Sequence, residues 1–181
     1  MNTKKLTITA LLTALAIVIP MIMPIKVVLP PFSATLAAHT PLIIAMFISP
    51  LAAVITSLGS GLGFLVTLGP VVAARAAMHV IFTVAGALMI RKNRNNFLVF
   101  IVTVILHSLS DMATVWIIDE LFVTANILKG QAMGAVQALL GLGTAVHHLV
   151  DYAIAMVVVI PVSKAFPKMF THTIESKELN I

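Results

Sequence analysis

The sequence predicts an all-α integral membrane protein, a bundle of six transmembrane helices with both termini in the cytoplasm. Hydrophobic residues make up 60% of the chain and charged residues only 9%. A soluble domain of this length needs a much larger charged surface. Apolar runs of membrane-spanning length follow one another along the chain, and most of the positive charge gathers between them. The solvent for most of these residues is therefore a lipid bilayer.

The N-terminal stretch MNTKKLTITALLTALAIVIP has a charged start and an apolar run, as a signal peptide does. It lacks a small-residue cleavage site before a polar segment, and further apolar runs follow at once. We therefore expect it to form the first membrane helix. The chain has no cysteine, which excludes disulfides and thiolate metal sites.

Six apolar segments each approach the length of about 20 residues with which a helix crosses the hydrocarbon. Their expected bounds are 6–23, 32–48, 51–68, 71–90, 97–118 and 139–162. The second and third segments are shorter and meet at Ser49-Pro50. Proline cannot continue the helical hydrogen-bond ladder, so a tight turn is expected there. The six segments form one membrane domain, residues 1–168, and residues 169–181 form a polar cytoplasmic tail.

The positive charges predict the orientation of this bundle. With six spans, Lys4 and Lys5, the polar break RKNR at 91–94 and the lysines near the C-terminus all fall on one side. The opposite side receives only Lys26 and Lys129. The positive-inside rule makes the first side cytoplasmic. This distribution suits a membrane protein and gives no basic surface for nucleic acid.

Ionisable residues inside the spans are few, and all but His39 lie in the fourth, fifth and sixth segments. They are His39, Arg75, His79, His107, Asp111, His147, His148 and Asp151. Three pairs, 75/79, 107/111 and 147/151, are four residues apart, so each pair shares one face of its helix. Charge at membrane depth is costly unless it is paired or wetted. We therefore expect the three faces to meet in one polar pocket, with His148 the least certain to point into it.

Several classes of ligand suit such a pocket. Two His-x-x-x-Asp pairs could bind a divalent cation, but Arg75 would repel one, so no metal and no cofactor is expected. The chain lacks the HExxH, GxSxG and serine–lysine patterns of enzymes, so no catalysis is expected. Histidine and aspartate could also relay protons. The mixture of arginine, histidine and aspartate favours a small polar organic solute.

Two further features bear on function. The connection PIKVVLPPFSATLAAHTP, residues 24–41, lies on the outer side and is stiffened by prolines, so it is expected to fold over the pocket as a lid carrying His39. Small residues one turn apart, Ala10 with Ala14 and Gly59 with Gly63, allow close helix contact. Such faces either pack within the subunit or dock another membrane protein.

These features together resemble the substrate-binding S component of energy-coupling factor vitamin transporters. The resemblance rests on KKLTITALLTALAIV with its Ala10-x-x-x-Ala14 face, the long first outer connection, the short helices around SPLAAVITSLGSGLGFL and the polar set of the later helices. It implies a six-helix bundle that binds a vitamin from outside and docks through Ala10 and Ala14 onto a transmembrane T component. Two ATPase subunits would supply the energy, since this chain has no GxxxxGK[ST] motif.

The resemblance implies a binding set but leaves the vitamin open. The set is Arg75, His79, His107, Asp111, His147 and Asp151, with His39 from the outer connection. Nickel and cobalt members carry a histidine after the initiator methionine, where this chain has Asn2.

Two aspartates against one arginine favour a ring alcohol, hydroxymethylpyrimidine or pyridoxine-like. A carboxylate such as pantothenate or niacin would instead use Arg75 as its counter-ion. A stand-alone secondary carrier, a divalent-cation transporter and a structural protein that binds no small solute remain as alternatives.

Overall fold

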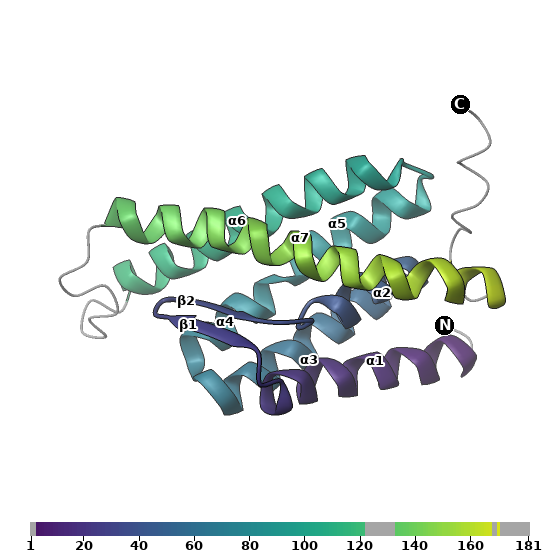
Figure 1. Ribbon diagram of the computed structural model, residues 1–181, viewed down its shortest axis with the longest axis horizontal. Coiled ribbons are helices and arrows are strands. Elements are labelled where there is room, and N and C mark those ends of the chain that lie inside the picture. The colour runs from purple at the N-terminus through teal and green to yellow at the C-terminus, as the bar shows by residue number, and fades with distance from the viewer. Residues whose placement is uncertain (1–2, 122–132, 168–169, 171–181) are drawn as a thin grey trace.

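Helices make up nearly all of the fold in the computed structural model, which describes residues 3–121, 133–167 and 170. The helices run roughly along the long axis of the molecule, and one short hairpin lies beside α7 (Figure 1). In chain order the elements are α1 (Thr3–Ile22), β1 (Lys26–Leu29), β2 (Phe32–Thr35), α2 (Thr40–Ile48), α3 (Pro50–Leu68), α4 (Pro70–Met78), α5 (Val80–Arg91), α6 (Asn96–Leu121) and α7 (Met133–Ala165).

Five stretches of helix are long and apolar enough to cross a membrane: α1, α3, α4 with α5, α6 and α7. Their outward side chains are apolar, and Val66 and Val157 are each more than 70% exposed. In water such a surface would be unfavourable, whereas in lipid it meets a matching solvent. The prediction of a multi-pass all-α membrane protein is confirmed, although the count of six spans is not.

The second expected segment, 32–48, differs from the prediction. Its first residues form strand β2, which pairs antiparallel with β1 from Lys26↔Thr35 to Leu29↔Phe32. Pro30 and Pro31 occupy the turn, where the missing N–H groups cost no ladder bond. Only α2 is helical, and its nine residues are too short to cross the hydrocarbon. Eight of those nine residues are buried, so α2 belongs to the core of the bundle.

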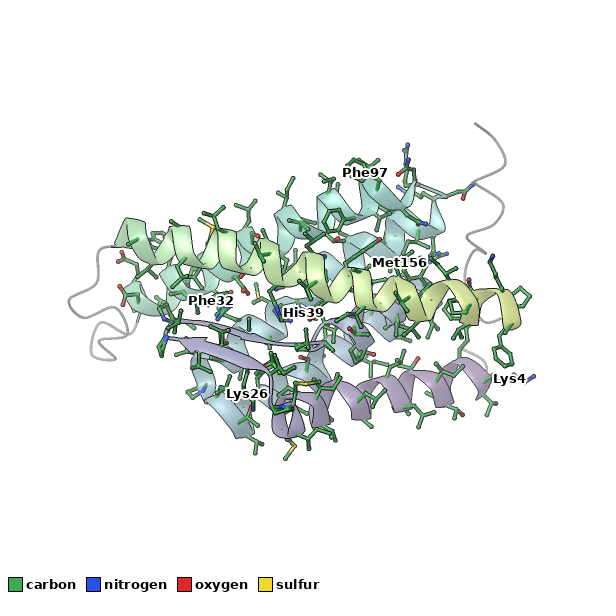
Figure 2. All side chains as sticks on the ribbon, viewed as in Figure 1. Lys4, Lys26, Phe32, His39, Phe97 and Met156 are labelled. Carbon is green, nitrogen blue, oxygen red and sulfur yellow. The ribbon has the colours of Figure 1, made fainter. Side chains whose placement is uncertain are left out.

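The positive charges gather at one end of the molecule. The start of α1, the turn between α5 and α6 and the end of α7 lie together there (Figure 1). Lys4 and Phe97, which follows the first residue of α6, mark this end, whereas Lys26 lies in the other half (Figure 2). The predicted orientation depends on this grouping of positive charges at one end. That this end faces the cytoplasm stays a prediction. The expected tail, 169–181, lies outside the described residues except for Phe170.

Small residues bring α1 and α3 into close contact. A Cβ atom at Gly63 would lie 2.5 Å from the carbonyl oxygen of Ile17, and one at Gly59 would lie 2.5 Å from Cγ2 of Thr13. The glycine face of α3 therefore packs within the subunit. Ala10 and Ala14 instead lie on the exposed side of α1.

Candidate functional site

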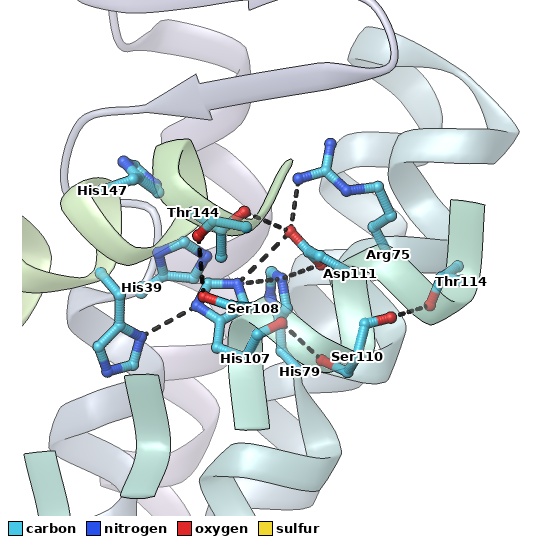
Figure 3. A network of polar contacts seen from close by, with 12 residues as sticks. His39, Arg75, His79, His107, Ser108, Ser110, Asp111, Thr114, Thr144 and His147 are labelled. Atoms are coloured by element: carbon cyan, nitrogen blue, oxygen red, sulfur yellow. Dashed lines mark hydrogen bonds and ion pairs between the residues drawn. The ribbon is translucent and has the colours of Figure 1, made fainter. Parts of the chain in front are cut away.

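The ionisable residues expected inside the membrane converge in the middle of the bundle. Seven of the eight are buried, and His147 is half-buried. Figure 3 shows most of them in one connected set of polar contacts contributed by α4, α6, α7 and the segment after β2. The prediction that the polar helix faces meet is consistent with this arrangement.

Arg75 and Asp111 form an ion pair at the centre of this set. Nη2 of Arg75 donates to Oδ2 of Asp111 at 2.5 Å, and the hydroxyl of Thr144 donates to the same oxygen at 3.0 Å. Nη1 of Arg75 donates to the carbonyl oxygen of Pro31 at 2.7 Å. Arginine suits such a site because its planar fork satisfies several acceptors at once. The pair thus joins α4, α6 and α7 and also attaches the hairpin turn.

Asp151 attaches the other end of the hairpin to α7. Its Oδ1 accepts from the backbone N–H of Ala37 at 2.7 Å, and its Oδ2 accepts from the backbone N–H of His39 at 2.8 Å. Nδ1 of His39 lies 3.0 Å from Oδ2, and Nε2 of His147 lies 3.4 Å from it. The carboxylate therefore holds the connection in place and does not line the cavity described below.

The histidines pack as a cluster of aromatic rings. The ring of His39 contacts those of His79, His107 and His147 at centroid distances of 4.5 to 4.7 Å. Nε2 of His107 lies 3.1 Å from Nε2 of His79, and Nδ1 of His107 lies 3.0 Å from Nδ1 of His148. His148, the least certain of the expected residues, is thus fully inside the network although it does not line the cavity.

A small cavity lies among these side chains, with a volume of about 20 Å³. That is room for about one water molecule, so a vitamin ring requires side chains or the hairpin to move. Six expected residues line the cavity: His39, Arg75, His79, His107, Asp111 and His147. Other lining residues come from β2 (Ser33 and Thr35), α3 (Phe64), α4 (Val72 and Ala76) and α7 (Thr144).

Four buried polar atoms of the lining residues have no hydrogen-bond partner. One of them, Nδ1 of His39, lies 3.0 Å from Oδ2 of Asp151 as an ion-pair contact. The other three, Nε of Arg75, Nδ1 of His79 and Oδ1 of Asp111, have no such close carboxylate or donor. A buried polar group without a partner costs about 1–3 kcal/mol. Most buried polar groups in proteins are satisfied, so three such atoms around one cavity call for an explanation. They are groups that a polar solute in the cavity would satisfy.

Two groups of side chains have the proximity that a metal ion requires among the described residues. They are His39, His79 and His107, and His39, His147 and Asp151, with ligand atoms within 4.8 Å of one another. In the first group, His79 and His107 are joined to each other through their Nε2 atoms. A metal ion bound there through those atoms would have to break this contact.

Sequence reasoning missed two threonines of the network. Thr144 bonds Asp111, and the hydroxyl of Thr103 lies 3.2 Å from Nε2 of His148. Thr103 precedes His107 by four residues and Thr144 precedes His148 by four, so helical spacing places each on the polar face. Two aromatic residues with polar groups on the same helices lie outside the network: Trp116 is exposed, and the hydroxyl of Tyr152 donates to the carbonyl of Asn96 at 3.4 Å.

An apolar groove of about 470 Å³ lies between the hairpin and α7, and His147 lines both the groove and the cavity. The ring of Phe32 fills the space above Gly143, where a Cβ atom would lie 2.7 Å from the ring. The hairpin and the residues that follow it are therefore held against the bundle by two polar attachments, at Arg75 and Asp151, and by one apolar contact.

A comparison with known proteins identifies a relative of this chain. The niacin transporter NiaX of Lactococcus lactis subsp. cremoris (strain MG1363) is 36% identical over 172 residues, which cover 91% of this chain and 77% of that protein. No family model and no solved structure matches the chain. The aligned region thus spans nearly the whole chain. The chain therefore belongs to the vitamin-specific S components of energy-coupling factor transporters, which are multi-pass proteins of bacterial membranes.

Proposed function

We propose that this chain captures niacin, a pyridine ring that carries a carboxyl group or its amide, for ATP-driven uptake. The observation that carries the proposal is the buried cavity in which Arg75, the only arginine among the lining residues, keeps Nε free beside histidine rings. A flat aromatic ring suits stacking on imidazoles, and a carboxyl oxygen suits a guanidinium donor. The niacin transporter of Lactococcus supports this choice of vitamin.

The ring alcohols expected from the sequence receive no support from that relative. That expectation counted Asp111 and Asp151 as hydrogen-bond partners for ligand hydroxyls. In the fold, however, Oδ2 of Asp111 is occupied by Arg75 and both oxygens of Asp151 are occupied by backbone N–H groups. Counting aspartates against arginines therefore does not identify the ligand.

The hairpin acts in this proposal as the lid of the site. It is attached through the Pro31 carbonyl to Arg75 and through Ala37 and His39 to Asp151. The cavity beneath it is too small for a pyridine ring, so the solute enters when the hairpin moves and these contacts re-form around it. The lid also explains why a site that binds a water-soluble solute is buried in the present arrangement.

The chain is proposed to bind without catalysis and to depend on partners for energy. These are a transmembrane T component and two ATPase subunits, which bind the ATP. The exposed face of α1 with Ala10 and Ala14 is the proposed docking surface, because small residues let a partner helix approach closely. Ala14→Trp should abolish co-purification with the T component and leave niacin affinity unchanged. Leu62→Trp, at an exposed position on α3, is the matched control.

Titration calorimetry of the purified protein tests the proposed ligand. Nicotinate, nicotinamide, pyridoxine, hydroxymethylpyrimidine and pantothenate are compared, and one or both of the first two should bind far more tightly than the rest. Arg75→Lys keeps the charge but removes the fork and Nε, so affinity should fall at least 30-fold, about 2 kcal/mol at 1.4 kcal/mol per tenfold.

Tighter binding of pyridoxine or hydroxymethylpyrimidine than of both niacin forms would overturn the choice of vitamin. Niacin uptake in cells that lack the ATPase subunits would instead favour a stand-alone carrier.

A further inference from the structure

The three unpartnered atoms around the cavity carry information about the group that satisfies them. Nε of Arg75 is a donor in every state, because the guanidinium keeps its protons. Oδ1 of Asp111 is an acceptor, because this carboxylate is paired through Oδ2 with the guanidinium of Arg75. Nδ1 of His79 is a donor or an acceptor depending on the tautomer of the ring. The tautomer of His79 therefore decides what the cavity recognises.

Thr103 fixes one end of a chain of hydrogen bonds that leads to His79. Its hydroxyl lies 2.9 Å from the carbonyl oxygen of Val99, within the range of an O–H donor. The same oxygen lies 3.2 Å from Nε2 of His148, which is long for an O–H donor but within the range of an N–H donor. The hydroxyl hydrogen therefore goes to the helix carbonyl, and Nε2 of His148 carries a hydrogen.

The rings of His79, His107 and His148 are neutral, because all three are buried and, among the described residues, no carboxylate oxygen is hydrogen-bonded to any of them. Asp111 holds Arg75, and Asp151 holds the N–H groups of Ala37 and His39. A positive charge on His79, His107 or His148 would therefore be buried without a hydrogen-bonded carboxylate to balance it.

A neutral imidazole has one N–H, so the remaining tautomers follow in turn. Nδ1 of His148 is a lone pair and accepts from Nδ1–H of His107 at 3.0 Å. Nε2 of His107 is then a lone pair and accepts from Nε2–H of His79 at 3.1 Å. The last free position, Nδ1 of His79, is therefore an acceptor.

We infer that the site selects the carboxamide form of the vitamin, pyridine-3-carboxamide, over the carboxylate. The chain of hydrogen bonds from Thr103 through His148 and His107 to His79 sets this preference. The inference rests on the proposed function. A carboxamide oxygen accepts from Nε of Arg75, and its NH₂ group has one hydrogen each for Oδ1 of Asp111 and Nδ1 of His79. A carboxylate has no hydrogen to give and would place its lone pairs against these two acceptors. It would also add a net negative charge, because Arg75 is already paired with Asp111.

The wild-type protein tests the preference directly. In titration calorimetry at neutral pH, nicotinamide should bind at least 10-fold more tightly than nicotinate. Equal affinities, or tighter nicotinate, would overturn the inference and leave niacin as the ligand. If neither pyridine bound while another vitamin did, the proposed function itself would fall.

Thr103 is a positioning residue, and its variants test the chain. Thr103→Val keeps the side-chain shape but removes the acceptor of His148 Nε2–H. The direction of donation along the three histidines can then reverse, which places a hydrogen on Nδ1 of His79. The ratio of nicotinamide to nicotinate affinity should fall at least fivefold, whereas Thr103→Ser should keep the wild-type ratio. A purely structural effect would weaken both ligands alike, so an unchanged ratio in Thr103→Val would overturn the role of the chain.

A measurement on the wild type keeps the test independent of how the variants fold. Nitrogen-15 NMR of labelled histidine distinguishes protonated from unprotonated ring nitrogens. An unprotonated Nδ1 in His79 supports the assignment, and a protonated Nδ1 overturns it.

Discussion

The two halves of the bundle make close helix contacts with different chemistry. Between α1 and α3 the contact depends on glycine: Gly59 and Gly63 leave no space for a side chain, and the hydroxyls of Thr13 and Thr56 lie 3.4 Å apart. Between α4, α6 and α7 it depends on buried charge and imidazole rings. Lipid supplies no hydrophobic force between helices, so each half needs its own means of association. Small residues fix helices in place, whereas polar groups also leave atoms free for a solute.

The largest expected effect comes from Asp151→Asn, which tests the polar half. An asparagine offers one oxygen where the hairpin needs two, and its NH₂ group would face a backbone N–H of Ala37 or His39. We expect a loss of about 3 kcal/mol in the attachment of the hairpin, and a fall in vitamin affinity of about 100-fold. Titration calorimetry and thermal unfolding in detergent measure both. Glu120→Gln, exposed at the end of α6, should change neither.

Gly63→Ala tests the small-residue half and should have the next largest effect. The new methyl group would lie 2.5 Å from a backbone oxygen of α1, so α1 and α3 must separate, at about 2 kcal/mol. The midpoint of thermal unfolding should fall, while the vitamin affinity of the folded protein should stay as in the wild type. Gly61→Ala is the matched control, since its Cβ atom meets neighbours at ordinary distances of 3.4 Å. If both variants were equally stable, close packing would not hold these helices together.

Gly143→Ala tests the apolar contact between α7 and the hairpin. Its methyl group would lie 2.7 Å from the ring of Phe32, a side chain that can shift, so the cost should be about 1 kcal/mol. The hairpin should close less well, and vitamin affinity should fall about fivefold. Gly134→Ala, with open space around its Cβ atom, should bind as the wild type does. A wild-type affinity in Gly143→Ala would show that this contact plays no part in closure.

The smallest expected effect comes from Ser57→Ala, between the two halves. The hydroxyls of Ser57 on α3 and Thr83 on α5 lie 3.0 Å apart, and both are buried. Hydrogen bonds between membrane helices contribute about 0.6 kcal/mol on average. The unfolding midpoint should fall slightly and vitamin binding should not change. A loss as large as that of Gly63→Ala would mean that polar contacts dominate here too.

Hydropathy predicted most of the helical framework, because lipid imposes one length and one polarity on every span. The bounds of α3, Pro50–Leu68, differ by one residue from those expected. The prediction of a helix over 32–48 was wrong in its first part. Pairing of Phe32–Thr35 with Lys26–Leu29 satisfies the backbone hydrogen bonds there without a helix. Hydropathy cannot detect such a pairing, since strands and helices of apolar residues look alike over short windows.

The candidate site was predictable in its membership and much less so in its roles. Four-residue spacing brought His107 and Asp111 to the same polar centre, because helical geometry alone places them on one face. Spacing could not show that Asp151 holds backbone groups of the hairpin, since that partner lies 114 residues away at Ala37. It also could not separate His147, which lines the cavity, from its neighbour His148, which does not.

The double attachment of Arg75 has a consequence for the exterior of the protein. The guanidinium touches the hairpin through Pro31 and also reaches the cavity with Nε. A solute that draws the Arg75 side chain toward itself competes with the hairpin for this residue. Binding of a solute in the cavity therefore changes the position of the hairpin on the outer surface of the protein. Full and empty carriers would then present different outlines to whatever protein meets them in the membrane.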